Sequence, residues 1–376
     1  MKNILIISPE PTHPPYAGNR ICILSYAEML RNKGYKVSFL WIANFNYLKQ
    51  EEILTRAYWK NNLYIFKKNQ IHRIKEAFFR YYRFKRLGFF KVDDNYPLGV
   101  KKLILQIQKK EQINVLIINY IYLSKIFNYI NGIKKILFTH DVFTNRYQIT
   151  GQQWFSVSAS EEAKALQRSD VILAIQESEA TFYRTLTSKK ILTTYSYFPI
   201  VETKLTGKKN LLYLAGPNVH NKEAIIFFIN TIFKSLVKAH PQITLLIGGG
   251  ICPEIEEIID TDQVELLGDI TDLNEFYAKG DIFINPTFNG TGLKIKTFEA
   301  MAHGKVVISH PHAVIGIYNK ETAPILIAEN LKEYTNYINY LFQNKEHLIK
   351  LKEASIQYIQ ELNEVITSRF IDAIEN

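Results

Sequence analysis

The sequence predicts an α/β protein with two domains, each built on a doubly wound parallel sheet. Short apolar segments of strand length alternate with amphipathic helical segments from the first residues onward; this is the pattern of parallel sheets covered by helices. The alternation begins again near residue 210, after a stretch of low apolar content at 198–209. A length of 376 residues, with 47% hydrophobic and 22% charged residues, fits two globular domains.

The first domain is expected at residues 1–198. It opens with a strand at 2–8, a loop with four prolines, and a helix at 21–33. That helix is expected to stop at Gly34, because glycine after the last apolar position is a common helix end. The other expected strands are 37–42, 115–119, 135–139, 171–174 and 191–194, and the other expected helices are 98–111, 156–168 and 177–186.

The second domain is expected at residues 210–345. Its strands are predicted at 211–215, 244–247, 264–267, 281–285, 306–309 and 323–327. Its helices are predicted at 222–239, 273–279, 293–302 and 332–342, and a last long helix at 345–361. Ligands of such sheets bind outside the carboxyl ends of the strands, so the expected site lies in a cleft between the two domains.

Cysteine usage and apolar run lengths exclude several classes of protein. Cys22 and Cys252 fall in different expected domains, which rules out a disulfide scaffold and fits a reducing cytoplasm. No apolar run reaches the roughly 18–20 residues that cross a bilayer, and the first residues lack a secretory apolar region. No Cys/His cluster has zinc spacing. We therefore expect a cytoplasmic protein without a metal site.

The net charge of +10 is concentrated in one segment, residues 67–91, which we call the basic segment. It holds nine Lys or Arg, one Glu and seven Phe or Tyr. One interpretation is a helix on an anionic membrane surface, with aromatics at the headgroups. A second is nucleic-acid binding by charge and stacking. A third is a helical pair whose aromatics lie in the domain core.

The segment 288–304 carries the most chemical information. Gly290 and Gly292 allow the backbone to approach a ligand closely, and a helix is expected to start directly after them. Unpaired N–H groups at a helix start favour an anion such as a diphosphate, and Lys294 or Lys296 can add charge. Glu299, three residues after Lys296 and on the same face, suits ribose hydroxyls. The alternative is a capped surface helix with a Lys296–Glu299 ion pair.

This segment, with the strand and proline before it and residues 303–309 after it, resembles the donor-binding signature of GT-B glycosyltransferases. The similarity is greatest to glycosyltransferase family 4, whose members carry a Gly-rich loop running into a Glu-Ala-Met-Ala helix. Residues 14–20 resemble the family's glycine loop near the acceptor, 138–142 its cleft strand end, and 264–270 its base-binding stretch. The resemblance covers most of the chain. It implies two Rossmann-like domains facing a central cleft, with 346–376 crossing back to the first domain.

The resemblance also implies a chemistry: metal-independent, retaining transfer from a nucleotide sugar, a UDP- or GDP-sugar, with no resident cofactor. Glu299 would hold the ribose, and backbone N–H groups around Gly292 and Leu293 would hold the diphosphate. The further donor-binding positions are Gly216, Lys222, Gly249, Asp269, Ile270, Thr291 and Lys294. The acceptor-binding positions are Gly18, Asn19, Arg20 and Arg146.

The sequence departs from the family pattern at two places. Thr291 stands eight positions before Glu299, where the family usually has another glutamate, so the identity of the sugar is open. The family usually has an arginine and a lysine after the first strand of the second domain. The arginine is absent here, and Lys222 is the candidate remnant of the pair. Because the diphosphate still needs a counter-charge, we assign that role to Lys296 in preference to Lys294.

His140 and Asp141 follow the strand at 135–139. A lone histidine near a core is most often a structural residue, but at a cleft strand end that resembles the family's donor-sugar contact we expect His140 to be functional. Asp141 would be the general base of an inverting enzyme. In a retaining enzyme it would orient His140 or bind acceptor hydroxyls. Arg146 would meet an anionic acceptor or the phosphates, or lie at the surface.

Two local patterns are set aside. Asp260-Thr261-Asp262 has the form of the metal-binding motif of the other large glycosyltransferase fold, but it lies between a predicted helix and strand and is not expected to bind metal. Gly248-Gly249-Gly250 lacks the spacing of a dinucleotide fingerprint and is expected to line the nucleotide cleft.

The sequence is thus interpreted as a glycosyltransferase acting on a glycan or lipid-linked glycan, in surface polysaccharide or glycolipid biosynthesis. We expect it at the inner face of the cell membrane, docked through residues 67–91, with no nucleic acid as partner. The alternatives are an inverting transferase, a nucleotide-sugar epimerase, for which no cluster of cleft carboxylates is found, and a non-enzymatic membrane- or nucleic-acid-binding module.

Overall fold

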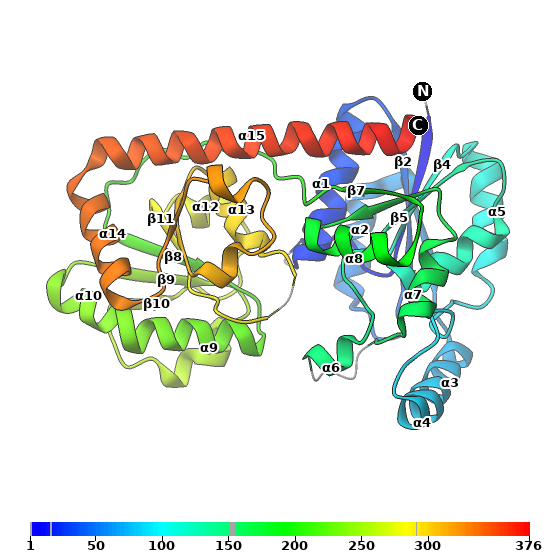
Figure 1. Ribbon diagram of the computed structural model, residues 1–376, viewed down its shortest axis with the longest axis horizontal. Coiled ribbons are helices and arrows are strands. Elements are labelled where there is room, and N and C mark those ends of the chain that lie inside the picture. The colour runs from blue at the N-terminus through cyan, green and yellow to red at the C-terminus, as the bar shows by residue number, and fades with distance from the viewer. Residues whose placement is uncertain (1, 16, 151–154, 291) are drawn as a thin grey trace. The chain divides into compact units, whose positions relative to one another are not determined.

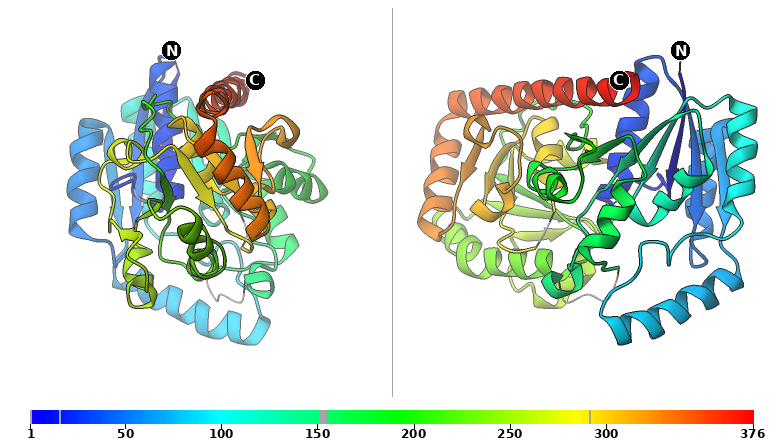
Figure 2. Two further views of the ribbon diagram at one scale, coloured as in Figure 1. Left: turned by 90° about the vertical axis from the view of Figure 1, so that its left-hand side faces the viewer. Right: turned by 45° about the vertical axis from the view of Figure 1, so that its right-hand side comes forward.

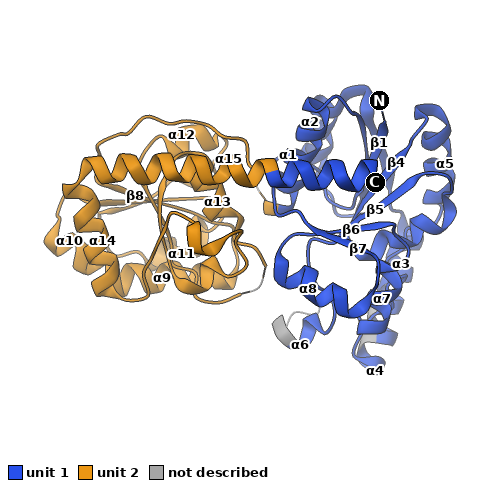
Figure 3. Ribbon diagram, turned by 45° about the horizontal axis from the view of Figure 1, so that its top comes forward, with its two compact units in different colours: residues 1–15, 19–197, 365–376 blue, residues 16–18, 198–364 orange. Residues whose placement is uncertain are grey.

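The computed structural model describes residues 2–15, 17–150, 155–290 and 292–376 (Figure 1). The chain divides into two compact units (Figure 3). Unit 1 comprises residues 1–15, 19–197 and 365–376, and unit 2 comprises residues 16–18 and 198–364. Each unit is a parallel sheet with helices on its faces, which is the fold class predicted from the sequence.

Unit 1 contains a seven-stranded sheet in the order β3-β2-β1-β4-β5-β6-β7, parallel at every pairing. The strands are β1 (Asn3–Ser8), β2 (Lys36–Ala43), β3 (Leu63–Lys67), β4 (Val115–Asn119), β5 (Lys134–Phe138), β6 (Val171–Ala174) and β7 (Lys190–Thr193). The helices are α1 (Gly18–Asn32), α2 (Lys49–Trp59), α3 (Gln70–Phe79), α4 (Lys85–Leu87), α5 (Val100–Glu111), α6 (Arg146–Thr150), α7 (Ala159–Leu166) and α8 (Glu177–Leu186).

Unit 2 contains a six-stranded parallel sheet in the order β10-β9-β8-β11-β12-β13. The strands are β8 (Asn210–Leu214), β9 (Thr244–Gly248), β10 (Val264–Leu266), β11 (Ile282–Asn285), β12 (Val306–Ser309) and β13 (Ile325–Ile327). The helices are α9 (Val219–Phe228), α10 (Lys234–Ala239), α11 (Cys252–Ile255), α12 (Leu273–Tyr277), α13 (Ile295–Ala302), α14 (Leu331–Gln343) and α15 (Lys345–Glu375).

Burial explains why the central strands were readable from the sequence. Every residue of β4 and of β11 is buried, because helices cover both faces of a doubly wound sheet and such strands are apolar throughout. Helix α1 ends where glycine was expected to stop it. Gly34 has φ +91°, and the N–H of Tyr35 donates to the carbonyl of Leu30, which is a left-handed helix cap.

The sequence analysis did not predict α2, β3 and α6 of unit 1, and the structure divides one predicted helix of unit 2. Helix α2 and strand β3 lie in a region for which the sequence analysis expected no element. Strand β3 pairs only with β2 at the sheet edge, and three of its five residues are partly exposed, so it lacks the long apolar run of a central strand. The helix expected at 222–239 is α9 and α10 joined by a π-helical turn at 229–233.

Helix α15 is longer than expected and extends to residue 375. Its last part belongs to unit 1, where the ring of Phe370 stacks on Tyr26 with centroids 5.1 Å apart. Lys190 pairs with Asp372 at 2.8 Å, and Lys2 pairs with Glu375 at 2.9 Å. None of the described helices combines the length and apolar character that a bilayer crossing requires.

Candidate functional site

The candidate donor site lies in unit 2 where the strand order reverses. From β8 the chain moves outward to β9 and β10, and from β11 it moves outward on the other side to β12 and β13. β8 and β11 are neighbours, so the loops that follow them diverge and leave a crevice at the carboxyl ends of the strands. The loop after β8 leads into α9, and the loop after β11 leads into α13.

The loop before α13 has the backbone geometry expected of a Gly-rich anion loop. Gly290 and Gly292 have φ of 92° and 79°, which an L side chain rarely adopts. A Cβ on Gly290 would also lie 3.1 Å from the ring of His220 on α9. Thr291, a predicted donor contact, lies outside the described residues. The side-chain amide of Asn285, the last residue of β11, donates to Thr297 Oγ1 at 2.8 Å and fixes α13 to the strand end.

Lys296 points from α13 to the first strand and helix of unit 2. Its Nζ is 3.0 Å from Asn221 Oδ1 and 3.3 Å from the hydroxyl of Tyr213, and it lies 4.6 Å from the centroid of the Tyr213 ring. Burial, together with the smaller effect of the Lys294 charge, lowers the pKa of Lys296 to about 7. The amine is thus held among neutral groups and lacks a full counter-charge, which an anionic ligand would supply.

Asn221 is oriented to receive this amine. Asn218 caps α9, with its side chain accepting from the N–H of Asn221 at 2.9 Å. The Asn221 side-chain N–H donates to the carbonyl of Gly216 at 3.0 Å, which leaves its oxygen for Lys296. Gly216 was a predicted donor residue, and it joins this hydrogen-bonded series after β8.

Glu299 lies one turn further along α13 and is buried. Its Oε2 accepts from the hydroxyl of Tyr277 on α12 at 3.1 Å. The Tyr277 ring stacks on His303, with centroids 4.3 Å apart. Burial raises the pKa of Glu299 to about 7, although the Tyr277 hydrogen bond opposes this. A carboxyl group with a single hydrogen-bond donor retains acceptor capacity for ligand hydroxyls.

The surface-helix alternative for α13 does not hold. All residues from Thr297 to Ala302 are buried, and Lys294 at the N-cap makes no side-chain capping bond. Among the described residues, the ion pairs do not include one between Lys296 and Glu299. Lys296 contacts β8 and α9, whereas Glu299 contacts α12.

Of the other predicted donor residues, three lie after β9 and β10, and one forms a surface ion pair. Gly249 has φ +95°, and a Cβ there would lie 2.4 Å from the carbonyl oxygen of Ala215, so only glycine fits this close approach after β9. Ile270 packs against Gly248, and Asp269 beside it is exposed. Lys222 pairs instead with Glu254 at 3.7 Å.

Leu293 and Lys294 complete the predicted donor loop. Both are partly exposed, and their carbonyls accept the N–H groups of Ile295 and Thr297 in the first turn of α13. Burial lowers the pKa of Lys294. The loop thus brings a second amine to the start of the helix that carries Lys296.

In unit 1, His140 lies at the carboxyl end of β5 and is buried between the rings of Tyr120 and Phe138, at centroid distances of 4.7 and 4.3 Å. Its Nε2 is 2.7 Å from Asn119 Oδ1. Because the Asn119 amide N–H donates to the carbonyl of Ile7, its oxygen faces the ring, so His140 carries its proton on Nε2. Burial lowers the pKa of His140 to about 3, so the ring is neutral.

Asp141 and Arg146 form an ion pair at 2.9 Å. Burial raises the pKa of Asp141, and the Arg146 charge opposes this. Sequence analysis missed Glu179, a buried carboxyl in the first turn of α8. Gln176 donates to one of its oxygens, and the other oxygen has no hydrogen-bond partner among the residues that the structure describes. Burial and the Asp141 charge raise its pKa to about 8.

The residues of the predicted acceptor loop make contacts with different parts of the structure. Gly18 belongs to unit 2, where a Cβ on it would lie 3.3 Å from Ile295 Cγ1 at the start of α13. Asn19 donates to the hydroxyl of Tyr120 at 3.0 Å, beside His140. Arg20 is buried and pairs with Glu51 at 2.6 Å, so it joins α1 to α2.

The described His, Cys, Asp and Glu residues form no group able to hold a metal ion. Asp260 of the Asp260-Thr261-Asp262 pattern pairs with Lys234 at 2.8 Å. The donor-site partners Tyr213 and Asn221 were not singled out as site residues. A tyrosine on a strand or helix is read as core, and nothing in the sequence shows which helix residue its hydroxyl will meet.

The donor-site residues of unit 2 lie within a stretch that matches a glycosyltransferase family model. Residues 208–344 match the family model described as glycosyl transferases group 1. A protein of Klebsiella pneumoniae, described as an uncharacterized 44.6 kDa protein in the cps region, is 22% identical over 400 residues, covering 96% of this chain and 96% of that protein.

Solved structures resemble the whole chain. HepE of Anabaena in complex with UDP has a TM-score of 0.67 at 12% identity, covering 100% of both chains. The pneumococcal O-GlcNAc transferase GtfA in complex with UDP and GlcNAc has a TM-score of 0.66 at 12% identity, covering 100% of this chain and 98% of that one. The chain has the GT-B fold, and its residues 208–344 match a glycosyltransferase family model.

Proposed function

We propose that the protein transfers a sugar from a nucleotide sugar, bound in unit 2, to a glycan or lipid-linked glycan with retention of configuration, as a member of glycosyltransferase family 4. The observation that carries this is the arrangement on α13. One short helix at the strand-order reversal holds an amine, Lys296, and a buried carboxyl, Glu299, behind a loop of left-handed glycines. A nucleotide supplies both a diphosphate for the amine and ribose hydroxyls for the carboxyl.

In this mechanism Lys296, protonated against the diphosphate, stabilises the charge that develops as the glycosidic bond to the donor breaks. The N–H groups at the Gly290–Gly292 loop add donors that need no proton transfer. Glu299 holds the ribose, and the leaving diphosphate takes the proton of the acceptor hydroxyl on the same face. Neutral His140 donates from Nε2 to Asn119, which suits a positioning hydrogen-bond role better than a cationic one.

We further propose UDP- or GDP-sugars as donors, with no resident cofactor or metal. The solved neighbours HepE and GtfA are complexes with UDP, and that supports uridine among the candidates. Asp141 and Arg146 are proposed to meet the acceptor. The related Klebsiella protein lies in the cps region, which supports a role in surface polysaccharide synthesis.

The test is nucleotide-sugar binding and turnover across UDP-, GDP-, ADP- and TDP-sugars in EDTA. One donor should bind and hydrolyse slowly. Lys296→Ala should lower the rate by about 10²–10³, the usual effect of losing a stabiliser of the leaving group, and Glu299→Ala should weaken binding. Lys238→Ala, at an exposed lysine of α10, is the matched control and should behave as wild type.

Two results would overturn parts of this proposal. No binder in the whole panel would remove the nucleotide site. Product of inverted anomeric configuration, detected by NMR, would replace retention with an inverting reaction in which Asp141 is the base.

We also propose that the enzyme works on the anionic inner face of the cell membrane. The basic segment forms α3, a π-helical turn at 80–84 and α4, which lie apart from the sheet of unit 1 (Figure 2). Ile71, Ile74, Phe78 and Tyr81 are 58% to 69% exposed there. Such a stripe beside cations suits a headgroup layer. The exposed Phe78 and Tyr81 do not fit the interpretation in which all aromatics of the basic segment lie in the core, whereas Phe90 is buried there.

A further inference from the structure

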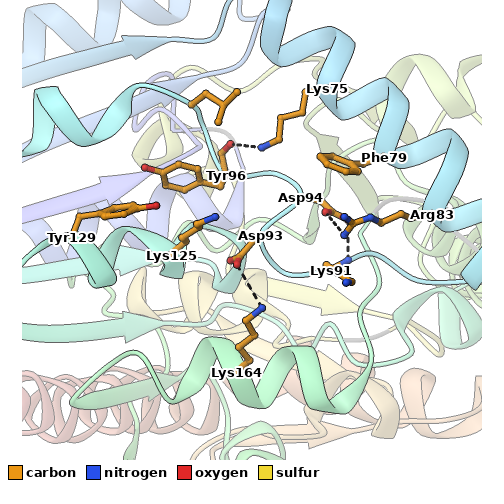
Figure 4. A pocket seen from close by; sticks show the side chains of 11 residues that line it. Lys75, Phe79, Arg83, Lys91, Asp93, Asp94, Tyr96, Lys125, Tyr129 and Lys164 are labelled. Carbon is orange, nitrogen blue, oxygen red and sulfur yellow. Dashed lines mark hydrogen bonds and ion pairs between the residues drawn. The ribbon is translucent and has the colours of Figure 1, made fainter.

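A basic cavity lies beneath α3 in unit 1 (Figure 4). Its volume is about 390 Å³. Five cationic side chains line it from four separate parts of the chain: Lys75, Arg83, Lys91, Lys125 and Lys164. Only two carboxylates, Asp93 and Asp94, line the same cavity, so its walls carry an excess of positive charge.

The two carboxylates are already committed to other groups. Asp93 pairs with Arg168, outside the cavity lining, at 2.7 Å, and only more distantly with Lys164 at 3.6 Å. Asp94 is nearly inaccessible; it pairs with Arg83 at 2.7 Å and accepts the backbone N–H of Lys91 at 2.9 Å. Neither carboxylate pairs with the remaining lysines of the wall.

Lys75 and Lys125 therefore face the cavity without an ion pair to either carboxylate, although Asp94 attracts Lys75 and Asp93 attracts Lys125 at longer range. Lys75 Nζ donates to the carbonyl oxygen of Tyr96 at 3.0 Å, and Lys125 Nζ lies 5.2 Å from the centroid of the Tyr96 ring. In the described part of the chain, no carboxylate lies within ion-pair distance of either amine. Burial and the charge of Lys125 lower the pKa of Lys75, while the charges of Asp94 and Glu76 oppose this shift. The two amines therefore repel each other in the free protein.

We infer that this cavity binds a phosphate or diphosphate group of the acceptor, at a site separate from the donor's diphosphate site on α13. A dianion between Lys75 and Lys125 would relieve their repulsion and form charge-assisted hydrogen bonds with both. The cavity is many times larger than one phosphate, which leaves room for the group attached to it. The inference rests on the proposed function, because it names the chemistry by which that acceptor is held.

The phosphate has two chemical sources, a lipid headgroup or a soluble phosphate ester. Helix α3 and the π-helical turn at 80–84 together carry the exposed apolar stripe, and they supply Lys75 and Arg83 to the cavity. A lipid-linked phosphate would thus meet its apolar and its charged contacts on one helical stretch. A soluble phosphate ester would use the cavity alone.

The first experiment titrates inorganic pyrophosphate into the full chain by calorimetry. The pair Lys75→Gln and Lys125→Gln should raise the Kd at least about tenfold, the effect of losing charge-assisted hydrogen bonds. Restoring both charges as Lys75→Arg and Lys125→Arg should recover most of the affinity. Lys102→Gln, at an exposed lysine of α5, is the matched control. Far-ultraviolet circular dichroism checks that each variant is folded.

A second arm separates this site from the donor site. Pyrophosphate binding that survives Lys296→Ala but is lost in the Lys75/Lys125 pair belongs to the cavity. Binding that is lost in Lys296→Ala and kept in the pair belongs to α13 and overturns the inference, as does no binding at all. Turnover of the nucleotide-sugar panel is measured separately. A protein that binds pyrophosphate in the cavity but turns over no nucleotide sugar would contradict the proposed function and leave the cavity site intact.

The last arm identifies the source. Vesicles of phosphatidylglycerol and of phosphatidylcholine are sedimented with the protein, with and without pyrophosphate. Displacement from phosphatidylglycerol by pyrophosphate, dependent on Lys75 and Lys125, assigns the cavity to a lipid headgroup. Pyrophosphate binding that leaves vesicle binding unchanged assigns it to a soluble phosphate ester.

Discussion

Glu299 and Lys296 both make the free protein less stable than uncharged residues of the same shape would. The folded pKa of Glu299 lies near 7, above its ordinary 4.5, and that of Lys296 lies near 7, below its ordinary 10.5. Each shift measures the free energy lost by burying the charged form. The unfolded chain keeps both groups ionised at neutral pH, so burial favours unfolding until a ligand supplies partners.

The carboxyl group gives a pH-dependent prediction. Between pH 4.5 and 7 the folded state holds a proton on Glu299 that the unfolded state has released, so stability falls as pH rises through this window. Glu299→Gln has no carboxyl group to titrate, so it should not lose stability as the pH rises. At pH 8 the variant should have a free energy of unfolding higher than that of wild type by up to about 3 kcal/mol, and it should therefore unfold at a higher temperature. It should also bind the nucleotide more weakly.

Thermal denaturation at pH 5 and at pH 8 checks this. At pH 5 the folded wild type already carries the proton, so the gain should nearly vanish. Tyr277→Phe is a useful companion, because it removes the hydroxyl that donates to Glu299 Oε2 and leaves the ring. A gain for Glu299→Gln of equal size at both pH values would mean that burial of the charge is not its cause.

At the scale of elements, the sequence predicted best where burial acts on a whole run of residues. The predicted strand 115–119 and helix 177–186 coincide with β4 and α8, because long-range packing and local pattern agree there. β3 was missed because an edge strand has no comparable burial. Within the site, Glu299 was found from its place after a glycine loop, a local signal.

The partners of the site residues were not predictable in the same way. Tyr277 lies 22 residues before Glu299, and Asn221 lies 75 residues before Lys296. Glu179 looks like an ordinary acidic residue in a first helical turn, where the helix dipole favours it. Only the fold reveals that its carboxyl is buried. The spacing of residues along the chain does not predict such contacts, because they depend on the order of the strands in the sheet.

Helix α3 gives a prediction at this scale. Ile74→Ser with Phe78→Ser removes two exposed apolar side chains and no charge. If the stripe enters the headgroup layer, sedimentation with phosphatidylglycerol vesicles should weaken about tenfold or more, since each buried side chain of this size contributes about 1.5–3 kcal/mol. Solubility and donor binding should not change.

Ile53→Ser on α2 is the matched control, because Ile53 is 51% exposed on another helix. It should sediment with vesicles as wild type does. High salt should weaken the binding of all three proteins, because cations contribute through screened attraction. If the α3 pair sediments like wild type at every salt concentration, the stripe does not contact the membrane.

At the scale of the whole molecule, α15 is a single helix that contributes to both units. Residues up to 364 belong to unit 2, and residues 365–376 belong to unit 1. The last segment buries Ile366, Phe370, Ala373 and Ile374. Phe370 also lies 6.1 Å from Phe138, the residue before Thr139 and His140. The C-terminal segment therefore helps to complete the core beneath the candidate acceptor site.

Deleting residues 365–376 should accordingly damage unit 1 and spare unit 2. The lost burial amounts to roughly 5 kcal/mol, a large part of a typical domain stability. Amide exchange measured by mass spectrometry should accelerate in β1 to β7 and stay unchanged in β8 to β13, since the apolar cluster around β8, β9, β11 and β12 contains no residue of the deleted segment.

Nucleotide binding in unit 2 should survive, and transfer to an acceptor should fail. Asp372→Asn, which removes the charge that contacts Lys190 and Asn376 at the surface, should change neither. Loss of nucleotide binding together with transfer would show that the donor site depends on the C-terminal segment, and that unit 2 does not hold its ligand alone.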